Sequence, residues 1–262
     1  AEAGAFKTAL LALMTLPTEG ESGLAKVNAV RAVNEVVDAS LLGWVFADNA
    51  RIAELNPDVS AVEYFATING RIIAPLDELN RLNSRADLTP IRSFDGEDFR
   101  KLLLGGGVLN YAVTALDALT PEAVVGAVTQ AVETSDLMPS GFDLARLSYL
   151  GLVIEAPESA LAGSSMRIFE SIASELKART GGAGIYQGLY RATAGPVTLR
   201  LIASTQSLPH RMREILTDAR REGQVLGEKV AEELPTLALG EITGFDLFRT
   251  KTRPSARPSR AA

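Results

Sequence analysis

The 262-residue chain contains no cysteine and only one histidine. The absence of cysteine excludes disulfide bonds, zinc ribbons, iron–sulfur clusters and thiol nucleophiles, and it fits a reducing compartment. Because His210 is the single imidazole, a multi-histidine metal centre within one chain is excluded. A Ser–His–Asp triad would have to use that same residue. The available chemistry therefore belongs mainly to carboxylates and amides, and we expect no metal site.

The chain also lacks a long apolar run. No stretch reaches the roughly 18–20 apolar residues that a membrane helix needs, and the longest candidates, Ala9–Leu13 and Leu41–Ala47, are short. At 47% apolar and 22% charged residues the composition is that of a globular protein. Its length suits one large domain or two ordinary ones. We therefore expect a cytoplasmic protein with no transmembrane segment.

Negative charge prevails except at the C-terminal end. The chain carries a net charge of −6, yet residues 249–262 hold five basic side chains and no acid, which leaves 21 basic and 32 acidic residues in the rest. An acidic body argues against a nucleic-acid partner. Residues 249–262 also contain Pro, Ser and Arg without an apolar anchor, so they are predicted to form a basic disordered tail.

Strand and helix patterns alternate in the first part of the chain. Apolar runs at Phe6–Met14 and Leu41–Ala47 predict buried strands. The helical spacing of valines between them predicts a helix over Leu24–Ala39. A short helix is expected directly after the second run, beginning at Asp48 and Asn49. This alternation predicts a parallel sheet.

A long amphipathic helix is predicted next. Ser60 and Glu63 form a capping box, and apolar residues then repeat every three or four positions as far as Leu82. The pattern covers about two dozen residues, more than most helices have. Pro75 lies inside it and predicts a kink. A helix of this length between two units would serve as a structural spine.

Thr89-Pro90 is expected to end the spine region, and a short helix is expected at Phe99–Leu104. The alternation of strands and helices restarts after this helix. The sequence then predicts strands and helices in alternation, over Val108–Leu116, Pro121–Thr134, Tyr149–Ile154 and Ala160–Arg179. Strands at Ile185–Arg191 and Val197–Ser204 are close in sequence and are expected to pair antiparallel. An amphipathic helix is expected over His210–Leu234. These elements predict a smaller α/β domain with a mixed sheet.

Three side chains could recognise a purine base. Asn49 follows the second strand, and ligands of open parallel sheets bind beyond the carboxyl ends of the strands. Phe65 and Asn69 are four residues apart, so they share one helix face. An aromatic ring can stack on a base, while an amide donates and accepts at its edge. The competing interpretation is structural, with Phe65 in the core, Asn49 as a helix cap and Asn69 solvated.

A second candidate is the segment Asp95-Gly-Glu-Asp98. Two carboxylates three residues apart at the start of a helix could orient a water molecule or hold a metal. Acids at this position also cap helices and complement the helix dipole, and the residues alone favour that role. The triple glycine at 105–107 matches no phosphate-loop pattern and predicts a turn between a helix and a strand.

Taken in order, these motifs resemble the second half of the tubulin/FtsZ family, over roughly residues 6–205. Thr15-Leu16-Pro17 resembles its strand-ending Thr-x-Pro, and Ser22-Gly23…Lys26-Val27-Asn28 resembles the Glu-Gly…Arg-Met-Asn that follows. Ala47-Asp48-Asn49 resembles its Ile-Asp-Asn. Phe65…Asn69 has the spacing of the aromatic residue and Asn on the central helix of the family, and Asp95-Gly-Glu-Asp98 resembles the Asp-x-x-Asp of the next loop.

The resemblance implies GTP or GDP as the bound nucleotide and leaves Mg²⁺ open. The nucleotide contacts would fall on Glu21, Lys26, Asn49, Phe65 and Asn69. Asp95 and Asp98 would be the catalytic pair, because this loop of the family enters the nucleotide site of the next subunit and activates hydrolysis. Such a contact joins subunits head to tail, which generates filaments when it does not close into a ring. The implied partner is therefore a second copy of the same protein.

The sequence departs from the family pattern at several positions. Ser22 stands where the family has a ribose-contacting Glu, with Glu21 beside it, and Lys26 replaces an Arg. Gly70 replaces a base-contacting Asp, and Ser93 replaces the Asn that begins the acidic loop. The glycine-rich phosphate-binding half is absent from the chain, which predicts a fragment, a processed chain or a separately encoded N-terminal half. A non-catalytic tubulin-like scaffold and an unrelated two-domain α/β enzyme remain the alternatives.

The predicted fold class is α/β: the back half of a parallel-sheet nucleotide-binding domain, a long central helix and a smaller α/β domain with a mixed sheet. The expected segments are 1–59 for the nucleotide-binding part, 60–104 for the central helix with the following loop and helix, 105–208 for the smaller domain, 209–248 for the C-terminal helix and extension, and 249–262 for the tail.

Overall fold

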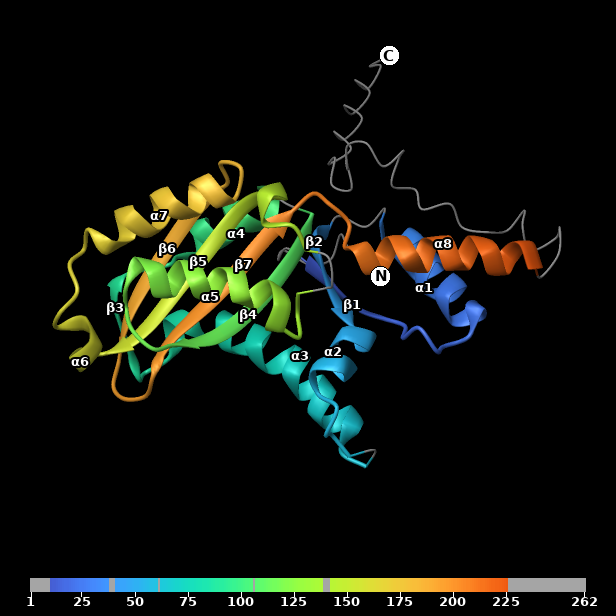
Figure 1. The fold of residues 1–262 in the computed structure, drawn as a ribbon, viewed down its shortest axis with the longest axis horizontal. Helices are drawn as coiled ribbons and strands as arrows, with labels where there is room; N and C mark the ends of the chain where they lie inside the picture. The colour runs from blue at the N-terminus through green and yellow to red at the C-terminus, as the bar shows by residue number, and fades with distance from the viewer. Residues whose placement is uncertain (1–9, 38–40, 61, 106, 139–141, 226–262) are drawn as a thin grey trace, which may run out of the picture.

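The computed structural model describes residues 10–37, 41–60, 62–105, 107–138 and 142–225 (Figure 1). The predicted basic tail and the second part of the predicted terminal helix lie outside these residues. None of the helices in the described ranges is long and apolar enough to cross a membrane.

The strands of the described residues form one sheet in the order β1-β2-β4-β7-β5-β6-β3. Their bounds are β1 Leu10–Leu16, β2 Leu41–Asp48, β3 Leu88–Arg92, β4 Val108–Leu116, β5 Leu147–Pro157, β6 Gly184–Ala192 and β7 Val197–Thr205. The pairs β1–β2, β2–β4 and β5–β6 are parallel, and the other three pairs are antiparallel. The predicted α/β class with a mixed sheet is confirmed.

The helices lie on both faces of this sheet and beside it (Figure 1). Their bounds are α1 Gly23–Val37, α2 Asn49–Leu55, α3 Tyr64–Asn80, α4 Gly96–Gly105, α5 Pro121–Thr134, α6 Glu158–Leu161, α7 Ile168–Arg179 and α8 His210–Val225, with 3₁₀ helices η1 Leu82–Ser84 and η2 Leu144–Arg146. Several of these begin and end close to the predicted positions. The helix α5 matches its prediction at both ends, because Thr120 caps it through an N–H···Oγ1 bond of 3.2 Å from Ala123.

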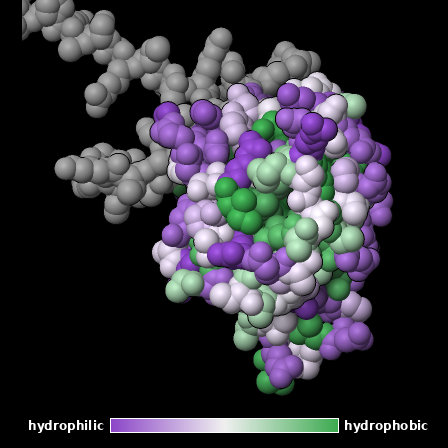
Figure 2. Space-filling model, turned by 90° about the vertical axis from the view of Figure 1, so that its left-hand side faces the viewer, coloured by the Kyte–Doolittle hydropathy of each residue, from purple (hydrophilic) through white to green (hydrophobic). Residues whose placement is uncertain are grey.

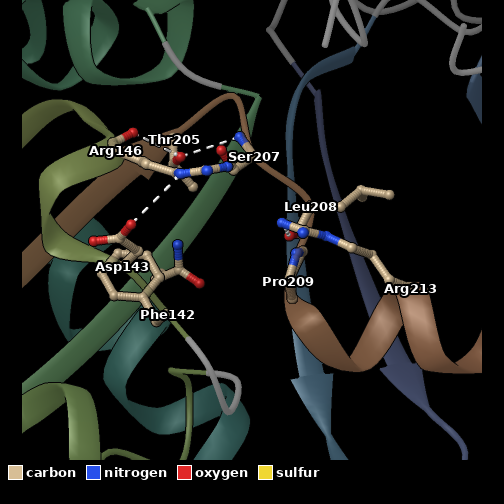
Figure 3. A pocket seen from close by; sticks show the side chains of 9 residues that line it. Phe142, Asp143, Arg146, Thr205, Ser207, Leu208, Pro209 and Arg213 are labelled. Atoms are coloured by element: carbon tan, nitrogen blue, oxygen red, sulfur yellow. Dashed lines mark hydrogen bonds and ion pairs between the residues drawn. The ribbon is translucent and has the colours of Figure 1, made fainter. Parts of the chain in front are cut away.

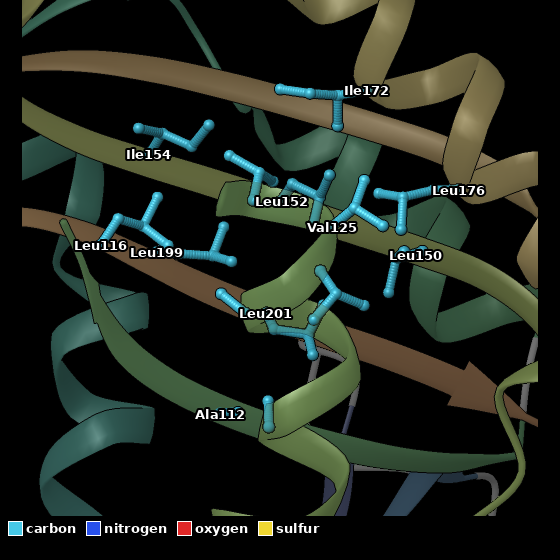
Figure 4. Packing of buried hydrophobic residues seen from close by; sticks show 14 of the residues in the cluster. Ala112, Leu116, Val125, Leu150, Leu152, Ile154, Ile172, Leu176, Leu199 and Leu201 are labelled. Atoms are coloured by element: carbon cyan, nitrogen blue, oxygen red, sulfur yellow. The ribbon is translucent and has the colours of Figure 1, made fainter. Parts of the chain in front are cut away.

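Two apolar layers hold the central strands. Val125 of α5 and Ile172 of α7 pack with Leu152 of β5 on one face (Figure 4). On the opposite face Val153, the next residue of β5, packs with residues of α3 and α4. This alternation along β5 is the two-residue period of a strand, and both faces of the strand are buried. Each fully buried Leu, Ile or Val side chain contributes about 1.5–3 kcal/mol to such a core.

The first part of the chain joins the sheet through a short ladder. Trp44 and Val45 of β2 pair with Val108 and Leu109 of β4. The helix α8 packs beside α1, where Ile215 shares an apolar cluster with Val30 (Figure 1). Strands from the predicted 1–59 and 105–208 segments thus belong to one sheet. The domain boundaries themselves stay predictions.

The central helix is shorter than predicted. It begins at Tyr64 and has 17 residues, because Ser60 and Glu63 close a separate turn before it. In that turn the Glu63 N–H donates to the Ser60 carbonyl at 3.1 Å and lies 3.3 Å from the Ser60 hydroxyl. The capping contact therefore forms, but one turn ahead of the helix. Leu82, predicted to end the helix, lies in η1 instead.

Two predictions about the last third of the chain are wrong. The strands β6 and β7 do not pair with each other, because β7 lies between β4 and β5 and β6 lies on the other side of β5. The predicted helix over Ala160–Arg179 is interrupted between α6 and α7. Gly163 has a poor helix propensity, and the Ser165 hydroxyl accepts the Arg167 N–H at 3.3 Å in the turn that precedes α7.

The strand β3 was not predicted, because we expected Thr89-Pro90 only to end the spine region. It pairs antiparallel with β6 at the edge of the sheet, where Pro90 costs no ladder bond. Only Leu88 of this strand is buried, so its sequence carries no strand period. At the end of the molecule shown in Figure 2, apolar side chains gather among polar ones. Ile91 of β3 and Met166 between α6 and α7 are 49% and 53% exposed.

Candidate functional site

The carboxyl ends of β1 and β2 meet at one edge, since Leu16 pairs with Asp48. Asp48 is 2% exposed and caps α2: its Oδ1 accepts the N–H groups of Ala50 and Arg51 at 3.1 and 3.4 Å. Burial raises the pKa of the Asp48 carboxyl, although these N–H groups oppose the rise. Asp48 therefore caps α2, and Asn49 does not. The Asn49 side-chain amide is half-buried and forms no hydrogen bond with another described residue.

A buried arginine of α8 reaches the same edge. Arg211 is 5% exposed, donates to the Pro17 carbonyl at 3.0 Å and lies 3.9 Å from the Asp48 carboxylate. It therefore ties α8 to the ends of both strands. Arg211 was not among the predicted site residues. Its sequence position could have identified it, because it lies four residues before Ile215 on the apolar side of the helix. A cation buried on that side must have partners.

Lys26 is turned toward α8. It is 7% exposed, and its Nζ lies 2.6 Å from the carboxylate of Asp218, an ion pair that lowers the pKa of Asp218. Glu21 lies exposed in the loop after β1, where its carboxylate accepts the Thr18 N–H at 2.8 Å. The structure thus brings Glu21 and Lys26 to the region that follows β1, but the Lys26 charge is already paired.

Phe65 and Asn69 lie on the exposed side of α3. The Phe65 ring is 75% exposed and touches only the edge of the Tyr64 ring among the described aromatic contacts, with centroids 5.5 Å apart. Asn69, one turn further on, is also exposed. The interpretation of Phe65 as a core residue is therefore wrong. An exposed aromatic ring on a helix, four residues from an exposed amide, suits stacking against a planar ligand.

The two acids at the start of α4, Asp95 just before it and Asp98 in its first turn, have different surroundings. The Asp95 Oδ1 accepts the N–H groups of Glu97 and Asp98 at 2.8 and 2.9 Å, so Asp95 caps the helix as the competing interpretation predicted. The half-buried Asp98 carboxylate forms no hydrogen bond or ion pair with another described residue. Of the two, Asp98 is the one that is free to act on something outside the subunit.

The segment that carries these acids is fixed to the sheet through Phe94. The Phe94 N–H donates to the Tyr190 hydroxyl at 2.9 Å, and this hydroxyl lies 2.9 Å from the Asn83 Oδ1. Asn83 in turn donates to the Phe94 carbonyl at 3.2 Å. The Phe94 ring lies over Gly151, and its Cβ lies over Gly188. Burial raises the pKa of Tyr190, so this hydroxyl remains protonated. The position of Asp98 is thus set by buried contacts.

Gly188→Ala is expected to lower the free energy of unfolding by about 1–3 kcal/mol, because overpacking displaces neighbouring groups. An added Cβ would lie 2.6 Å from the Phe94 Cβ. Urea unfolding of the two proteins gives the difference. The matched control is Gly126→Ala on α5, where an added Cβ meets nothing within 4 Å. That change is expected to be neutral or to stabilise by about 1 kcal/mol. An equal loss in both variants would contradict the packing argument.

The acids and the amide–aromatic set do not form one site within a single chain. Figure 1 shows α4 well apart from α2. No group of three or more His, Cys, Asp or Glu side chains in the described ranges is arranged to hold a metal ion. The arrangement therefore places an exposed aromatic ring at one end and, at another, a carboxylate unpaired among the described residues.

Comparison with known proteins identifies the family. The family described as "Tubulin/FtsZ-like protein TubZ-like, C-terminal domain" matches residues 78–216, more than half of the chain. No curated protein matches the sequence.

Solved structures share the fold at low sequence identity. One is a GTPγS-bound protofilament of CetZ2 from Haloferax volcanii, at 19% identity and a TM-score of 0.66, covering 86% of this chain and 64% of that one. A GDP-form protofilament of TubZ from Bacillus thuringiensis serovar israelensis has 14% identity, a TM-score of 0.65 and coverage of 87% and 61%. An empty FtsZ dimer from M. jannaschii has 16% identity, a TM-score of 0.58 and coverage of 77% and 56%. The chain thus spans about three fifths of the length of these proteins.

Proposed function

The chain belongs to the TubZ-like family of tubulin/FtsZ-like cytoskeletal proteins, and from this premise we propose that it is part of a cytoplasmic protein that binds GTP and polymerises head to tail into filaments. In this proposal GTP hydrolysis is completed at the contact between two subunits. The proposal rests on the separation of two side chains, the exposed aromatic ring of Phe65 and the free carboxylate of Asp98. Phe65 lies on α3 and Asp98 lies on α4.

Base recognition falls on α2 and α3. The exposed Phe65 ring stacks on the guanine, and stacking of this kind contributes about 1–3 kcal/mol per base. The amides of Asn49 and Asn69 donate and accept at the base edge. Glu21 and Lys26 flank the ribose side, where Lys26 is shared with Asp218. The described residues contain no phosphate-binding glycine loop, so these side chains account for the base and the ribose only.

The acidic segment acts on a neighbouring subunit. Asp95 fixes the first turn of α4, and Asp98 orients a water molecule toward the nucleotide held by the next copy, as general base or by position. This water attacks the γ-phosphorus of the bound GTP, the bond from that phosphorus to the β–γ bridging oxygen breaks, and GDP and phosphate are the products. Such a contact uses two different surfaces and is therefore heterologous, which favours open filaments. The protofilament structures named above support this arrangement. We assign no step to Mg²⁺.

Phe65→Ala tests the nucleotide contact in the full-length protein that carries this chain. The expected result is GTP binding weakened about tenfold and a matching rise in the GTP concentration needed for half-maximal sedimentation of filaments. The thermal unfolding temperature should not change, because the ring is 75% exposed.

Ile91→Ala serves as the matched control, since it removes a similarly exposed apolar side chain from β3 and should leave GTP binding unchanged. GTP binding that is indifferent to Phe65, or sedimentation that is indifferent to GTP, would contradict the proposal. Binding and assembly without any hydrolysis would favour the non-catalytic scaffold.

A further inference from the structure

A cavity of about 210 Å³ lies where α8 meets the sheet (Figure 3). Its walls come from the first residues of α8, the end of β7, the start of β4 and the segment around η2. The lining residues are Asn110, Phe142, Asp143, Arg146, Thr205, Ser207, Leu208, Pro209 and Arg213. The proposed function uses none of them. The volume equals about seven water molecules at about 30 Å³ each, which suits a small organic ligand.

A buried donor in this cavity has no partner. Asn110 is 1% exposed, and its Nδ2 forms no hydrogen bond within the described part of the chain. The Arg213 Nε is also buried without a bond there. An unsatisfied buried donor costs about 1–3 kcal/mol, and more when it is charged. Two such donors in the lining of one cavity indicate that an acceptor belongs in it.

The charge of the cavity specifies the kind of acceptor. Figure 3 shows the guanidinium groups of Arg146 and Arg213 extending toward each other from opposite sides. Arg146 lies 3.5 Å from the Asp143 carboxylate, and Arg213 donates to the Leu208 carbonyl at 3.0 Å. Two cations and one anion leave the cavity with a net charge of +1. Guanidinium groups bind planar oxyanions through two parallel hydrogen bonds, so a carboxylate fits these donors.

The remaining wall is apolar. It consists of Phe142, Leu208 and Pro209. A ligand that satisfies both walls carries a carboxylate at one end and a compact apolar body at the other. We propose that this cavity binds a small carboxylate of that kind, held by Asn110, Arg146 and Arg213. Because Arg213 belongs to α8 and the other two lie on β4 and η2, the bound carboxylate links α8 to the sheet.

Sodium benzoate is a suitable probe, with benzamide as a neutral molecule of the same shape and inorganic phosphate as an oxyanion without an apolar body. Benzoate is expected to raise the thermal unfolding temperature of the full chain with increasing concentration, as a ligand of the native state must. It should also shift the side-chain amide signal of Asn110 in ¹⁵N NMR spectra. Benzamide and phosphate should change the unfolding temperature and the Asn110 signal only weakly.

Arg146→Gln and Arg213→Gln are each expected to weaken benzoate binding about tenfold or more, since each removes a charge-assisted hydrogen bond. The Arg146 side chain is 63% exposed, so its replacement leaves the fold intact even if the Arg213 variant unfolds. Arg167→Gln, an exposed arginine away from the cavity, removes the same charge and should bind benzoate normally.

Three results would overturn the proposal: equal binding of benzoate and benzamide, tighter binding of phosphate than of benzoate, or unchanged benzoate binding by the Arg146 and Arg213 variants. None of these measurements involves GTP or filaments. The carboxylate site can therefore fail while the proposed function stands, and the reverse also holds.

Discussion

Asp98→Ala is expected to reduce GTP hydrolysis by filaments of the full-length protein at least about 100-fold, the usual contribution of a general base. Assembly itself should persist, because Asp98 makes no hydrogen bond or ion pair with another described residue and its loss leaves the Phe94–Tyr190 contacts in place. The measurement is phosphate release per polymerised subunit, with the polymer determined by sedimentation in the presence of GTPγS. A small effect would show that Asp98 is not the catalytic carboxylate.

Glu97→Gln is the matched control. Glu97 lies in the same turn of α4, is exposed and forms an ion pair with Arg100 at 2.8 Å. Exposed pairs of this kind contribute about 0–1 kcal/mol. Its replacement removes one negative charge from the same surface, as Asp98→Ala does, yet should leave hydrolysis within about twofold of the unchanged protein. The comparison separates a specific carboxylate from the general field of an acidic surface.

Mixing two variants tests whether the carboxylate acts on a neighbour. Phe65→Ala subunits bind GTP weakly but keep Asp98, and Asp98→Ala subunits bind GTP normally but lack the carboxylate. If each site is shared between subunits, a mixture contains junctions where intact Phe65 meets intact Asp98. At GTP concentrations too low to fill Phe65→Ala subunits, hydrolysis by the mixture should therefore exceed the sum of the two variants measured alone. A mixture no more active than the sum of its components would show that Asp98 acts within its own subunit.

Local patterns account for the elements that the sequence predicted well. The helix α5 carries its own start signals, Thr120 and Pro121, and its valines face one side. The strand β4 is a mainly apolar run, interrupted at Asn110 and Thr114. In both cases the decisive contacts lie within a few residues along the chain. The same holds for the start of α2 directly after β2 and for the helical spacing of Phe65 and Asn69, although the cap of α2 is Asp48 and not Asn49.

The errors arise where distant residues decide. The strands β6 and β7 are joined by a short connection, which favours a hairpin. Instead β7, which is buried along nearly its whole length, lies between β4 and β5 and pairs with both. No local signal specifies those partners. The candidate site shows the same limit, because Lys26 resembles a nucleotide contact in sequence while its charge is paired with Asp218, 192 residues away. The exposure of Phe65 likewise follows from which face of α3 packs on the sheet.

The second large effect is expected from Arg200→Met, which should lower the free energy of unfolding by about 3 kcal/mol. Arg200 of β7 is 5% exposed. Its Nε lies 2.5 Å from the Glu155 carboxylate and its Nη1 lies 2.6 Å from the Glu78 carboxylate. Burial lowers the pKa of Arg200, but the bonds to Glu155 and the Tyr111 hydroxyl outweigh it and hold the pKa above its usual value. The guanidinium is charged and its partners depend on it.

Removal of this cation leaves a buried carboxylate short of partners. Glu155 is 5% exposed, and among the described residues it would keep one ion-pair partner, Arg85 at 2.9 Å. A buried ion pair adds little net stability, yet breaking one side costs about 3–5 kcal/mol because the remaining charge stays desolvated. The remaining bond to Arg85 places our expectation at the lower end of that range. Urea unfolding should show a lower midpoint with an unchanged slope.

Two further variants separate a stranded charge from lost packing. Arg100→Met breaks an exposed pair with Glu97 and should cost less than about 1 kcal/mol. The double variant Arg200→Met with Glu155→Leu removes both buried charges and should recover most of the stability lost by Arg200→Met alone, because apolar groups of similar size replace buried ion pairs at little cost. A double variant less stable than the single one would mean that Glu155 stabilises the fold through its remaining bond to Arg85, and that a stranded charge is not the cause of the loss.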